Sequence, residues 1–303
     1  MYCMPSPGCR QQVLSPAWKG DFMFPVIYDF GVVRIFGFQF HFAIYSFGFM
    51  LVIAFYSCYY LLNHDLKRAG YDAKLASDIV FWAAVGGILG SKVYYLLENL
   101  DRVIDDPAGM ILSGSGLVFL GGLLGGLLAV TLLLRKHKLP WLVFADLVAP
   151  LLILGSSIGR IGCFLVGDDY GLPSKLPWAV SFEQGLPPTT TQSFQVHYPW
   201  IDISDFPTGI LTVHPTQIYE TILAFGIFLY LWNKRTSITL PGSLFYLYLI
   251  LYGTERFLIE FIRTNPKYVL SIFSGAQIIS VMMVVIGAYF YIKPINSGVP
   301  EET

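Results

Sequence analysis

Apolar residues gather in long runs separated by short polar segments, and the chain does not follow the period of two that a half-buried strand shows. Several runs approach the roughly 20 apolar residues that a helix needs to cross a bilayer. The pattern therefore predicts an all-α polytopic membrane protein with seven transmembrane helices. The expected spans are residues 41–62, 78–97, 116–134, 144–162, 215–232, 242–262 and 274–292.

Two segments outside these runs have a different character. Residues 22–40 are predicted to form short β-prone pieces, and residues 163–213 form a long connection rich in proline, threonine and aromatic residues. Long connections of this kind are commonly functional, and aromatic side chains settle at membrane interfaces. Because no internal repeat or Gly/Ser linker divides the chain, we expect one membrane domain over residues 1–303. It has an N-terminal arm at 1–40 and an ordered cap at 163–213.

Basic residues in the short connections predict the orientation. Lysine and arginine are enriched in cytoplasmic loops, and here they concentrate after the first, third and fifth spans. This places the N-terminus, the arm and the cap outside and the C-terminus inside. The residues concerned are Lys67, Arg68 and Lys74, then Arg135, Lys136 and Lys138, then Lys234 and Arg235.

Composition agrees with a membrane protein, since 55% of the residues are hydrophobic and 13% are charged, against about 25% charged in soluble domains. The four cysteines form no metal-ligand pattern. Cys3 and Cys9 are either a disulfide or two free thiols. Residues 1–21 lack the apolar core of a cleavable signal peptide, so the first span is expected to direct insertion.

Arg160 is the most informative residue, because it follows an apolar run. A guanidinium at membrane depth costs roughly 3 kcal/mol by insertion measurements, and its planar fork suits phosphate. After it, Gly162, Gly167 and Gly171 surround Asp168 and Asp169 in a predicted tight, re-entrant turn. The carboxylates either orient Arg160 or accept a proton, and they are too few for a calcium or magnesium site.

The sixth span carries a second set of polar residues at helical spacing. Tyr252, Arg256, Glu260 and Arg263 are four, four and three residues apart, which places them within an arc of roughly 80° on one helix face. One alternative is that these side chains have a functional role. The others are that Arg256 and Glu260 form an ion pair that only neutralises its own charges, and that Arg263 extends to the membrane interface.

The fifth span opens with HPTQIYE, in which His214, Gln217 and Glu220 occupy a sector of roughly 120°. His214 is either a base or donor or a structural histidine. Glycine pairs in the second and third spans indicate close helix packing, although Gly121 and Gly122 could also leave room for an acyl chain.

These residues resemble the motifs of the prolipoprotein diacylglyceryl transferase family. The family signature GRxGNFxNGExxG is similar to GRIGCFLVGDDYG here, followed by LPWAV. HPSQLYE is similar to HPTQIYE, and YGxxRFxxExxR is similar to YGTERFLIEFIR. The glycine-rich elements ILGSKVYY and SGLVFLGGLLGG also match, so the likeness runs from about residue 42 to residue 280.

The resemblance implies transfer of the diacylglyceryl group of phosphatidylglycerol to the thiol of a lipobox cysteine in a prolipoprotein signal peptide, with release of glycerol phosphate. It also implies a bacterial inner-membrane location. The chemistry requires cations for the phosphate leaving group and a base for the thiol. Neither metal nor cofactor is needed. We expect a monomer without a nucleic-acid partner. The candidate catalytic residues are Arg160, Arg256, Tyr252, His214 and Asp168; the candidate substrate-binding residues are Arg160, Gly171, Cys163, Glu260, Gln217, Glu220, Gly121 and Gly122.

The chain departs from the family pattern at polar positions. Leu120 replaces the usual histidine or tyrosine before the glycine pair, Cys163 and Val166 replace two asparagines, and Phe47 replaces a tyrosine. These changes leave the arginines intact but remove groups that transfer protons. The alternatives are a transferase with another acceptor or weak activity, and a seven-span anion transporter or receptor.

Overall fold

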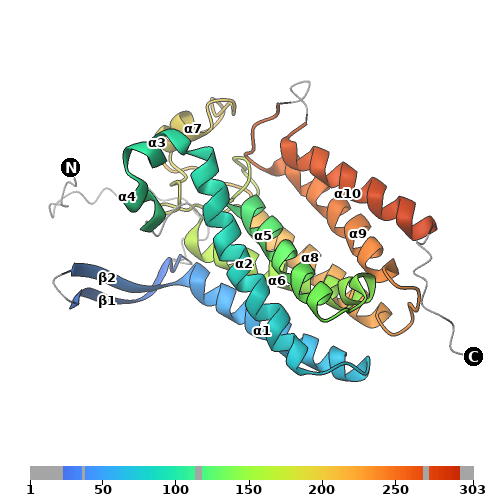
Figure 1. The fold of residues 1–303 in the computed structure, drawn as a ribbon. Coiled ribbons are helices and arrows are strands. Elements are labelled where there is room, and N and C mark those ends of the chain that lie inside the picture. Colours follow the sequence, from blue (N-terminus) through green and yellow to red (C-terminus); the bar gives the residue numbers. More distant parts are fainter. Residues whose placement is uncertain (1–22, 36–37, 113–117, 269–272, 294–303) are drawn as a thin grey trace, which may run out of the picture.

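The computed structural model describes residues 23–35, 38–112, 118–268 and 273–293, and this part of the chain is mostly helical (Figure 1). Each predicted apolar run corresponds to a long helix. Four of these helices, α1, α2, α6 and α10, are long and apolar enough to cross a membrane. The long helices are α1 (Ser46–Arg68), α2 (Lys74–Glu98), α5 (Phe119–Lys136), α6 (Trp141–Val166), α8 (Thr216–Lys234), α9 (Ser243–Ile259) and α10 (Gly275–Ile292).

Short helices lie in the connections. They are α3 (Leu100–Asp105), α4 (Pro107–Leu112), α7 (Thr191–His197) and the 3-10 helix η1 (Glu260–Ile262). In Figure 1, α3, α4 and α7 gather near one end of the long helices, and the turns that follow α1, α5 and α8 lie at the other end. The basic residues of those three turns therefore share one end of the bundle.

An antiparallel hairpin of β1 (Val26–Ile35) and β2 (Phe38–Tyr45) precedes the bundle. The β-prone pieces predicted at 22–40 are confirmed for the described residues, but the predicted start of the first span at residue 41 is wrong. Strand β2 continues through Tyr45, because FQFHFAIY is rich in aromatic and β-branched residues. The backbone N–H of Ser46 donates to the carbonyl of Pro25 at 3.1 Å, which joins the hairpin to the start of α1.

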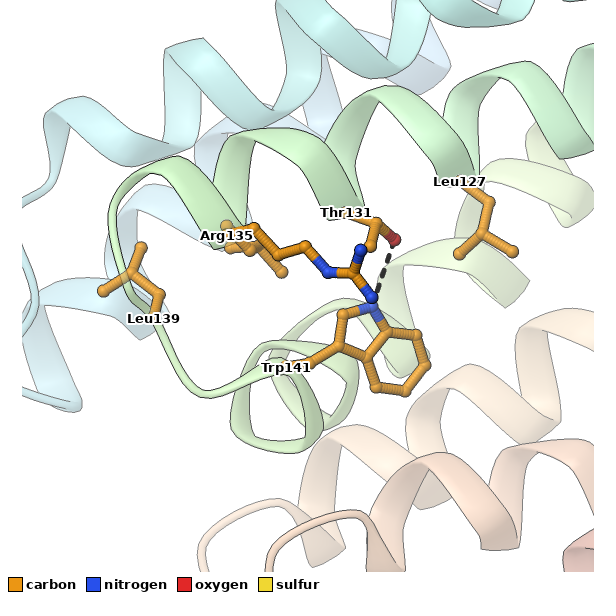
Figure 2. Close-up of a pocket in the computed structure, with 6 residues that line it drawn as sticks. Leu127, Thr131, Arg135, Leu139 and Trp141 are labelled. Carbon is orange, nitrogen blue, oxygen red and sulfur yellow. Dashed lines mark hydrogen bonds between the residues drawn. The ribbon is translucent and has the colours of Figure 1, made fainter.

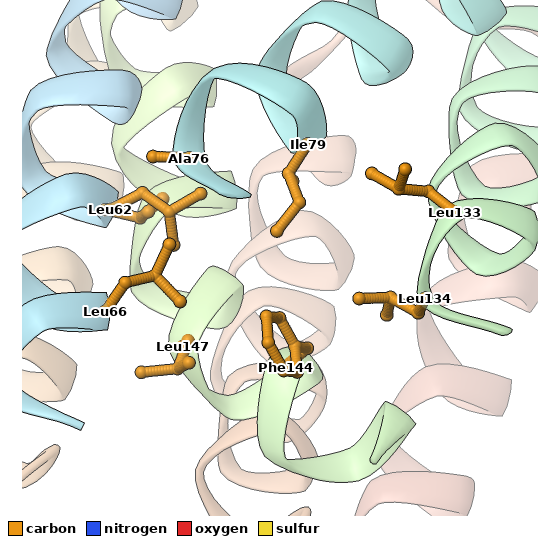
Figure 3. Close-up of a cluster of buried hydrophobic side chains, with 9 residues drawn as sticks. Leu62, Leu66, Ala76, Ile79, Leu133, Leu134, Phe144 and Leu147 are labelled. Atoms are coloured by element: carbon orange, nitrogen blue, oxygen red, sulfur yellow. The ribbon is translucent and has the colours of Figure 1, made fainter. Parts of the chain in front are cut away.

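Helix α6 is the centre of the bundle and packs against α1, α8 and α9. In its most apolar window 44% of the residues are buried inside the protein, against 11% for α2. One apolar cluster lies where α1, α2, α5 and α6 meet, at the end with the basic turns (Figure 3). A second cluster joins α6, α8 and α9. The side chains labelled in Figure 3 are Leu62, Leu66, Ala76, Ile79, Leu133, Leu134, Phe144 and Leu147.

Helices α2 and α5 cross at very close range through their glycines. A Cβ added to Gly90 would lie 2.4 Å from the carbonyl oxygen of Gly121, and one added to Gly125 would lie 2.2 Å from that of Gly86. The predicted close packing is therefore present. Beside Gly121 and Gly122, the positions of the missing side chains are filled by Tyr94 and Ser91 of α2. These contacts explain both glycines by packing, and their assignment to substrate binding stays a prediction.

The long connection between α6 and α8 is folded around aromatic residues. Tyr170 stacks between Phe182, at 5.7 Å, and Phe194 of α7, at 5.9 Å between ring centroids. Leu211 and Val213 complete this buried cluster, and Val180 exchanges two backbone hydrogen bonds with Val213. The connection therefore has a small core of its own beside the end of α6.

Candidate anion site at the end of helix α6

Helix α6 continues beyond the point where the sequence predicted a turn. The tight turn was expected from Gly162, but the helix runs through Gly162 and Cys163 to Val166, and Gly167 ends it with φ +75°. Gly162 packs closely on α1, since a Cβ there would lie 3.1 Å from the ring of Phe47. Arg160 is thus held rigidly within the helix.

Glu220 of α8 is the centre of the site, because it contacts three arginines. Its Oε2 lies 2.7 Å from Nε of Arg160 and 3.0 Å from Nη1 of Arg256. Its Oε1 accepts a hydrogen bond from Nη1 of Arg263 at 2.9 Å. Arg160 and Arg256 therefore meet at one oxygen atom, although they come from α6 and α9.

Two further carboxylates complete the arrangement. Asp169 bridges two arginines, with Oδ2 at 2.7 Å from Nη1 of Arg160 and Oδ1 at 2.8 Å from Nη2 of Arg263. Glu260 lies 3.2 Å from Nη2 of Arg256. We call these residues the arginine cluster: Arg160, Arg256, Arg263, Asp169, Glu220 and Glu260.

Asp169 is the most exposed member of the arginine cluster, and Arg160 and Arg256 are partly buried. The side chains of Arg160 and Arg263 are 17% and 6% exposed, and that of Glu220 is 4% exposed, whereas that of Asp169 is 47% exposed. Asp169 also has φ +57°, a left-handed conformation that is uncommon for a residue with a side chain. Asp169 is therefore the member of the cluster that is most accessible to solvent.

Arg263 is a member of this cluster that the sequence analysis left unresolved. The alternative that it reaches out to the interface is wrong, since it is buried between Asp169 and Glu220. Its spacing of three residues from Glu260 was the available signal. No sequence pattern indicated Asn265 and Ser274, which donate to Oε1 of Glu260 at 2.7 and 2.8 Å. The expected contact of Glu260 with Arg256 is present, and Glu260 also has partners of its own.

Three segments meet at Gly171. Its backbone pairs with Arg263, and its N–H donates to the carbonyl of His214 at 2.9 Å. A Cβ at residue 171 would lie 2.6 Å from the carbonyl oxygen of Ile262, so glycine is required there. Gln217, fully buried, donates from Nε2 to the carbonyl oxygen of Asp168 at 2.6 Å. These contacts hold the loop from Asp168 to Gly171 against α8 and the end of α9.

Among the described residues, Cys163, Tyr252 and His214 form no ion pair or hydrogen bond with the side chains of the arginine cluster. Cys163 is a buried free thiol. The ring of Tyr252 stacks on Tyr248 at 5.6 Å, and the ring of His214 is half-buried, 6.2 Å from that of Tyr219. Their chemical roles stay predictions.

Asp168, Asp169 and His214 differ in how readily they bind a proton. Burial raises the pKa of Asp168 and the negative charge of Asp169 adds to this effect, while a hydrogen bond from the Cys163 thiol to the carboxylate acts in the opposite direction. Oδ1 of Asp168 is buried without a hydrogen-bond partner among the described residues. Burial also acts to raise the pKa of Asp169, but Arg263 and Arg160 outweigh it and lower that pKa. Burial lowers the pKa of His214. Asp169 is therefore the fixed anion, and Asp168 and His214 are the groups suited to exchange protons.

The apolar helices define a membrane protein. The guanidinium groups gathered at the end of α6, from two helices and the residue after η1, form a candidate site for an anionic group. The profile of the family described as prolipoprotein diacylglyceryl transferase matches residues 34–293. This chain belongs to that family.

Curated relatives of similar length support the assignment. A phosphatidylglycerol–prolipoprotein diacylglyceryl transferase of Clostridium tetani is 33% identical over 249 residues, which are 82% of this chain and 92% of the relative. The protein of the same name from Shewanella oneidensis is 31% identical over 281 residues, 89% of this chain and 95% of the relative. A transferase numbered 2 from Clostridium perfringens is 31% identical over 252 residues, 82% of this chain and 90% of the relative.

Proposed function

We propose that this chain transfers the diacylglyceryl group of phosphatidylglycerol to the lipobox cysteine thiol of prolipoproteins and releases glycerol phosphate. The thiolate sulfur attacks the glycerol carbon, the carbon–oxygen bond to phosphate breaks, and the electron pair leaves with the phosphate. The names of the relatives support the substrates. The observation that carries the proposal is the meeting of Arg160 and Arg256 at one oxygen of Glu220.

The arginine cluster suits this leaving group, because fixed cations in a dry site stabilise charge that develops during reaction. In the proposed complex, Arg160 and Arg256 bind the phosphate, Tyr252 adds a donor, and Glu260 orients Arg256. The phosphate displaces the exposed Asp169 carboxylate from Arg160, which frees that guanidinium group for the lipid. Glu220 continues to contact the arginines. Gln217 and Gly171 hold the loop that contains Asp168 and Asp169.

The thiol proton needs an acceptor, and Leu120 offers none. The two candidates are Asp168, in the loop after α6, and His214, two residues before α8. We favour Asp168. Its Oδ1 has no hydrogen-bond partner among the described residues, and the next residue, Asp169, contacts Arg160. Cys163 lines the same end of α6.

We further propose that all seven long helices cross the bacterial cytoplasmic membrane as one domain of a monomer. The N-terminus, the arm and the cap lie outside and the C-terminus lies inside. The basic turns at one end of the bundle support this orientation. The arginine cluster then lies at the outer side, where a secreted prolipoprotein arrives.

The test is an assay with phosphatidylglycerol labelled in its acyl chains and glycerol headgroup and a lipobox peptide, with complementation of a strain depleted of its own transferase. We expect a thioether-linked product and released glycerol phosphate. Wild type is compared with Leu120→His, which restores a titratable group. Glycerol phosphate release without thioether product would assign another acceptor, and no turnover by either protein would reject the transferase.

A further inference from the structure

A pocket of about 360 Å³ lies far from the arginine cluster, between the second half of α5, the following turn and the start of α6 (Figure 2). Three leucines form most of its apolar wall, and one tryptophan forms its floor. Its polar groups are one hydroxyl and one guanidinium. The lining residues are Leu127, Thr131, Leu134, Arg135, Leu139 and Trp141.

Arg135 is the charged group of this pocket. Its side chain is exposed, and none of the ion pairs recorded among the described residues includes it. The next residues, Lys136, His137 and Lys138, are also exposed. In contrast, Arg68 and Arg235, at the same end of the bundle, both bind Asp65. Arg135 therefore has the positive charge available for an external anion.

Trp141 of the pocket contacts residues of α5 and α9. Nε1 of Trp141 donates to Oγ1 of Thr131 at 3.2 Å, and its ring packs edge-on against Phe245 of α9 at 5.7 Å between centroids. Helix α5 packs mainly on α2 and makes few contacts with α6. The pocket is thus a preformed gap between two helices that their own side chains leave unfilled.

The position of the pocket separates it from the substrate site. Trp141 begins α6 and Arg160 lies near its other end, so at 1.5 Å per residue they are about 28 Å apart. The hydrocarbon core of a bilayer is about 30 Å thick. In the orientation proposed above, the two sites face opposite leaflets, and one lipid cannot occupy both.

We infer that this pocket binds one anionic glycerophospholipid of the inner leaflet. Its phosphate lies on Arg135, and an acyl chain follows Leu127, Leu134 and Leu139 against the face of Trp141. Charge complementarity selects the anionic headgroup, because Arg135 is the charged residue that lines the pocket and it forms no ion pair among the described residues. Bound there, the lipid would fill the gap between α5 and α6.

Native mass spectrometry of the full-length protein, titrated with phosphatidylglycerol in mild detergent, counts tightly bound lipids. We expect two in wild type, one in Arg160→Ala, one in Arg135→Ala and none in the double variant. Arg135→Ala should weaken the second lipid by about tenfold, as loss of one charge-assisted hydrogen bond predicts. Lys136→Ala, which removes an exposed charge one residue away, is the matched control and should retain both.

Phosphatidylcholine with the same acyl chains provides the second arm. We expect it to occupy the pocket at least fivefold more weakly, since its headgroup has no net charge. The inference is overturned if Lys136→Ala loses the lipid as readily as Arg135→Ala, if phosphatidylcholine binds equally well, or if Arg160→Ala alone removes both lipids. The last result would leave the proposed transferase function intact.

Discussion

At the residue scale, Arg160 provides the most direct test of the arginine cluster. It contacts Glu220 through Nε and Asp169 through Nη1, a forked arrangement that lysine cannot reproduce. We expect Arg160→Ala and Arg160→Lys both to lower kcat/KM with labelled phosphatidylglycerol by about 100-fold or more, the cost of a lost transition-state donor. Arg68→Lys, at the opposite end of the bundle, is the control. Near-normal turnover by Arg160→Lys would show that charge alone is sufficient.

Asp169 is expected to have the opposite effect on substrate binding. If phosphate replaces this carboxylate, Asp169→Asn removes a competitor while Glu220 still holds Arg263. KM for phosphatidylglycerol should fall about threefold, which is under about 1 kcal/mol of binding free energy. Asp202→Asn, an exposed change elsewhere in the connection, should leave KM unchanged. A higher KM in Asp169→Asn would instead assign Asp169 to orienting the arginines.

The pH dependence identifies the proton acceptor. A carboxyl group whose pKa is raised keeps its proton to a higher pH, so its carboxylate form is lost as the pH falls through that raised pKa. We therefore expect kcat/KM to decrease on the acidic side, and we expect Asp168→Asn to lower the rate and abolish this acidic limb. His214→Gln should retain it. An acidic limb that persists in Asp168→Asn and disappears in His214→Gln would exchange the two roles.

Helical spacing predicted part of the site in advance. Glu260 begins η1 four residues after Arg256 of α9, and Gln217 and Glu220 share a face of α8, so the proximity within each pair follows from the sequence. The contact of Glu220 with three arginines does not, because it depends on how α6, α8 and α9 pack. Asp169 and Arg263 meet only because the loop at Gly171 pairs with the chain after η1, a long-range contact that no local pattern indicates.

At the element scale, the crossing of α2 and α5 depends on backbone contact. Gly90→Ala should destabilise the fold by about 1–3 kcal/mol through overpacking, because the new methyl group would lie 2.4 Å from the backbone of Gly121. Thermal unfolding in detergent measures this as a lower midpoint. Gly226→Ala on α8 is matched, since nothing lies within 4 Å of its added Cβ. Equal midpoints for the two variants would contradict the close crossing.

Element boundaries show where sequence patterns are insufficient. The glycines after Arg160 suggested a turn from Gly162, but that glycine serves helix packing against Phe47, and only Gly167 adopts a left-handed conformation. Similarly, the apolar run from residue 41 contains the end of a strand, because aromatic residues suit both a strand and a membrane helix. In both cases tertiary contacts decide between two local structures that the residues allow.

At the scale of the whole molecule, the proposed orientation is open to chemical labelling. In a variant with Cys3 and Cys9 changed to serine, the remaining Cys58 and Cys163 are partly or fully buried. We expect Asp205→Cys in the cap to react with a membrane-impermeant maleimide in intact cells. Lys136→Cys, in the turn after α5, should react only after the membrane is permeabilised. The reverse labelling pattern would show that the protein has the opposite orientation in the membrane.

The arginine cluster balances its charges: three guanidinium groups face the carboxylates of Glu220, Glu260 and Asp169. A phosphodiester that enters adds one negative charge to a site that has no excess cation among these groups. Uptake of the donor lipid should therefore be accompanied either by release of Asp169 into water or by capture of a proton from solution. In the second case the affinity for lipid would increase as the medium becomes more acidic, even though catalysis slows, so that loading and turnover have opposite pH preferences.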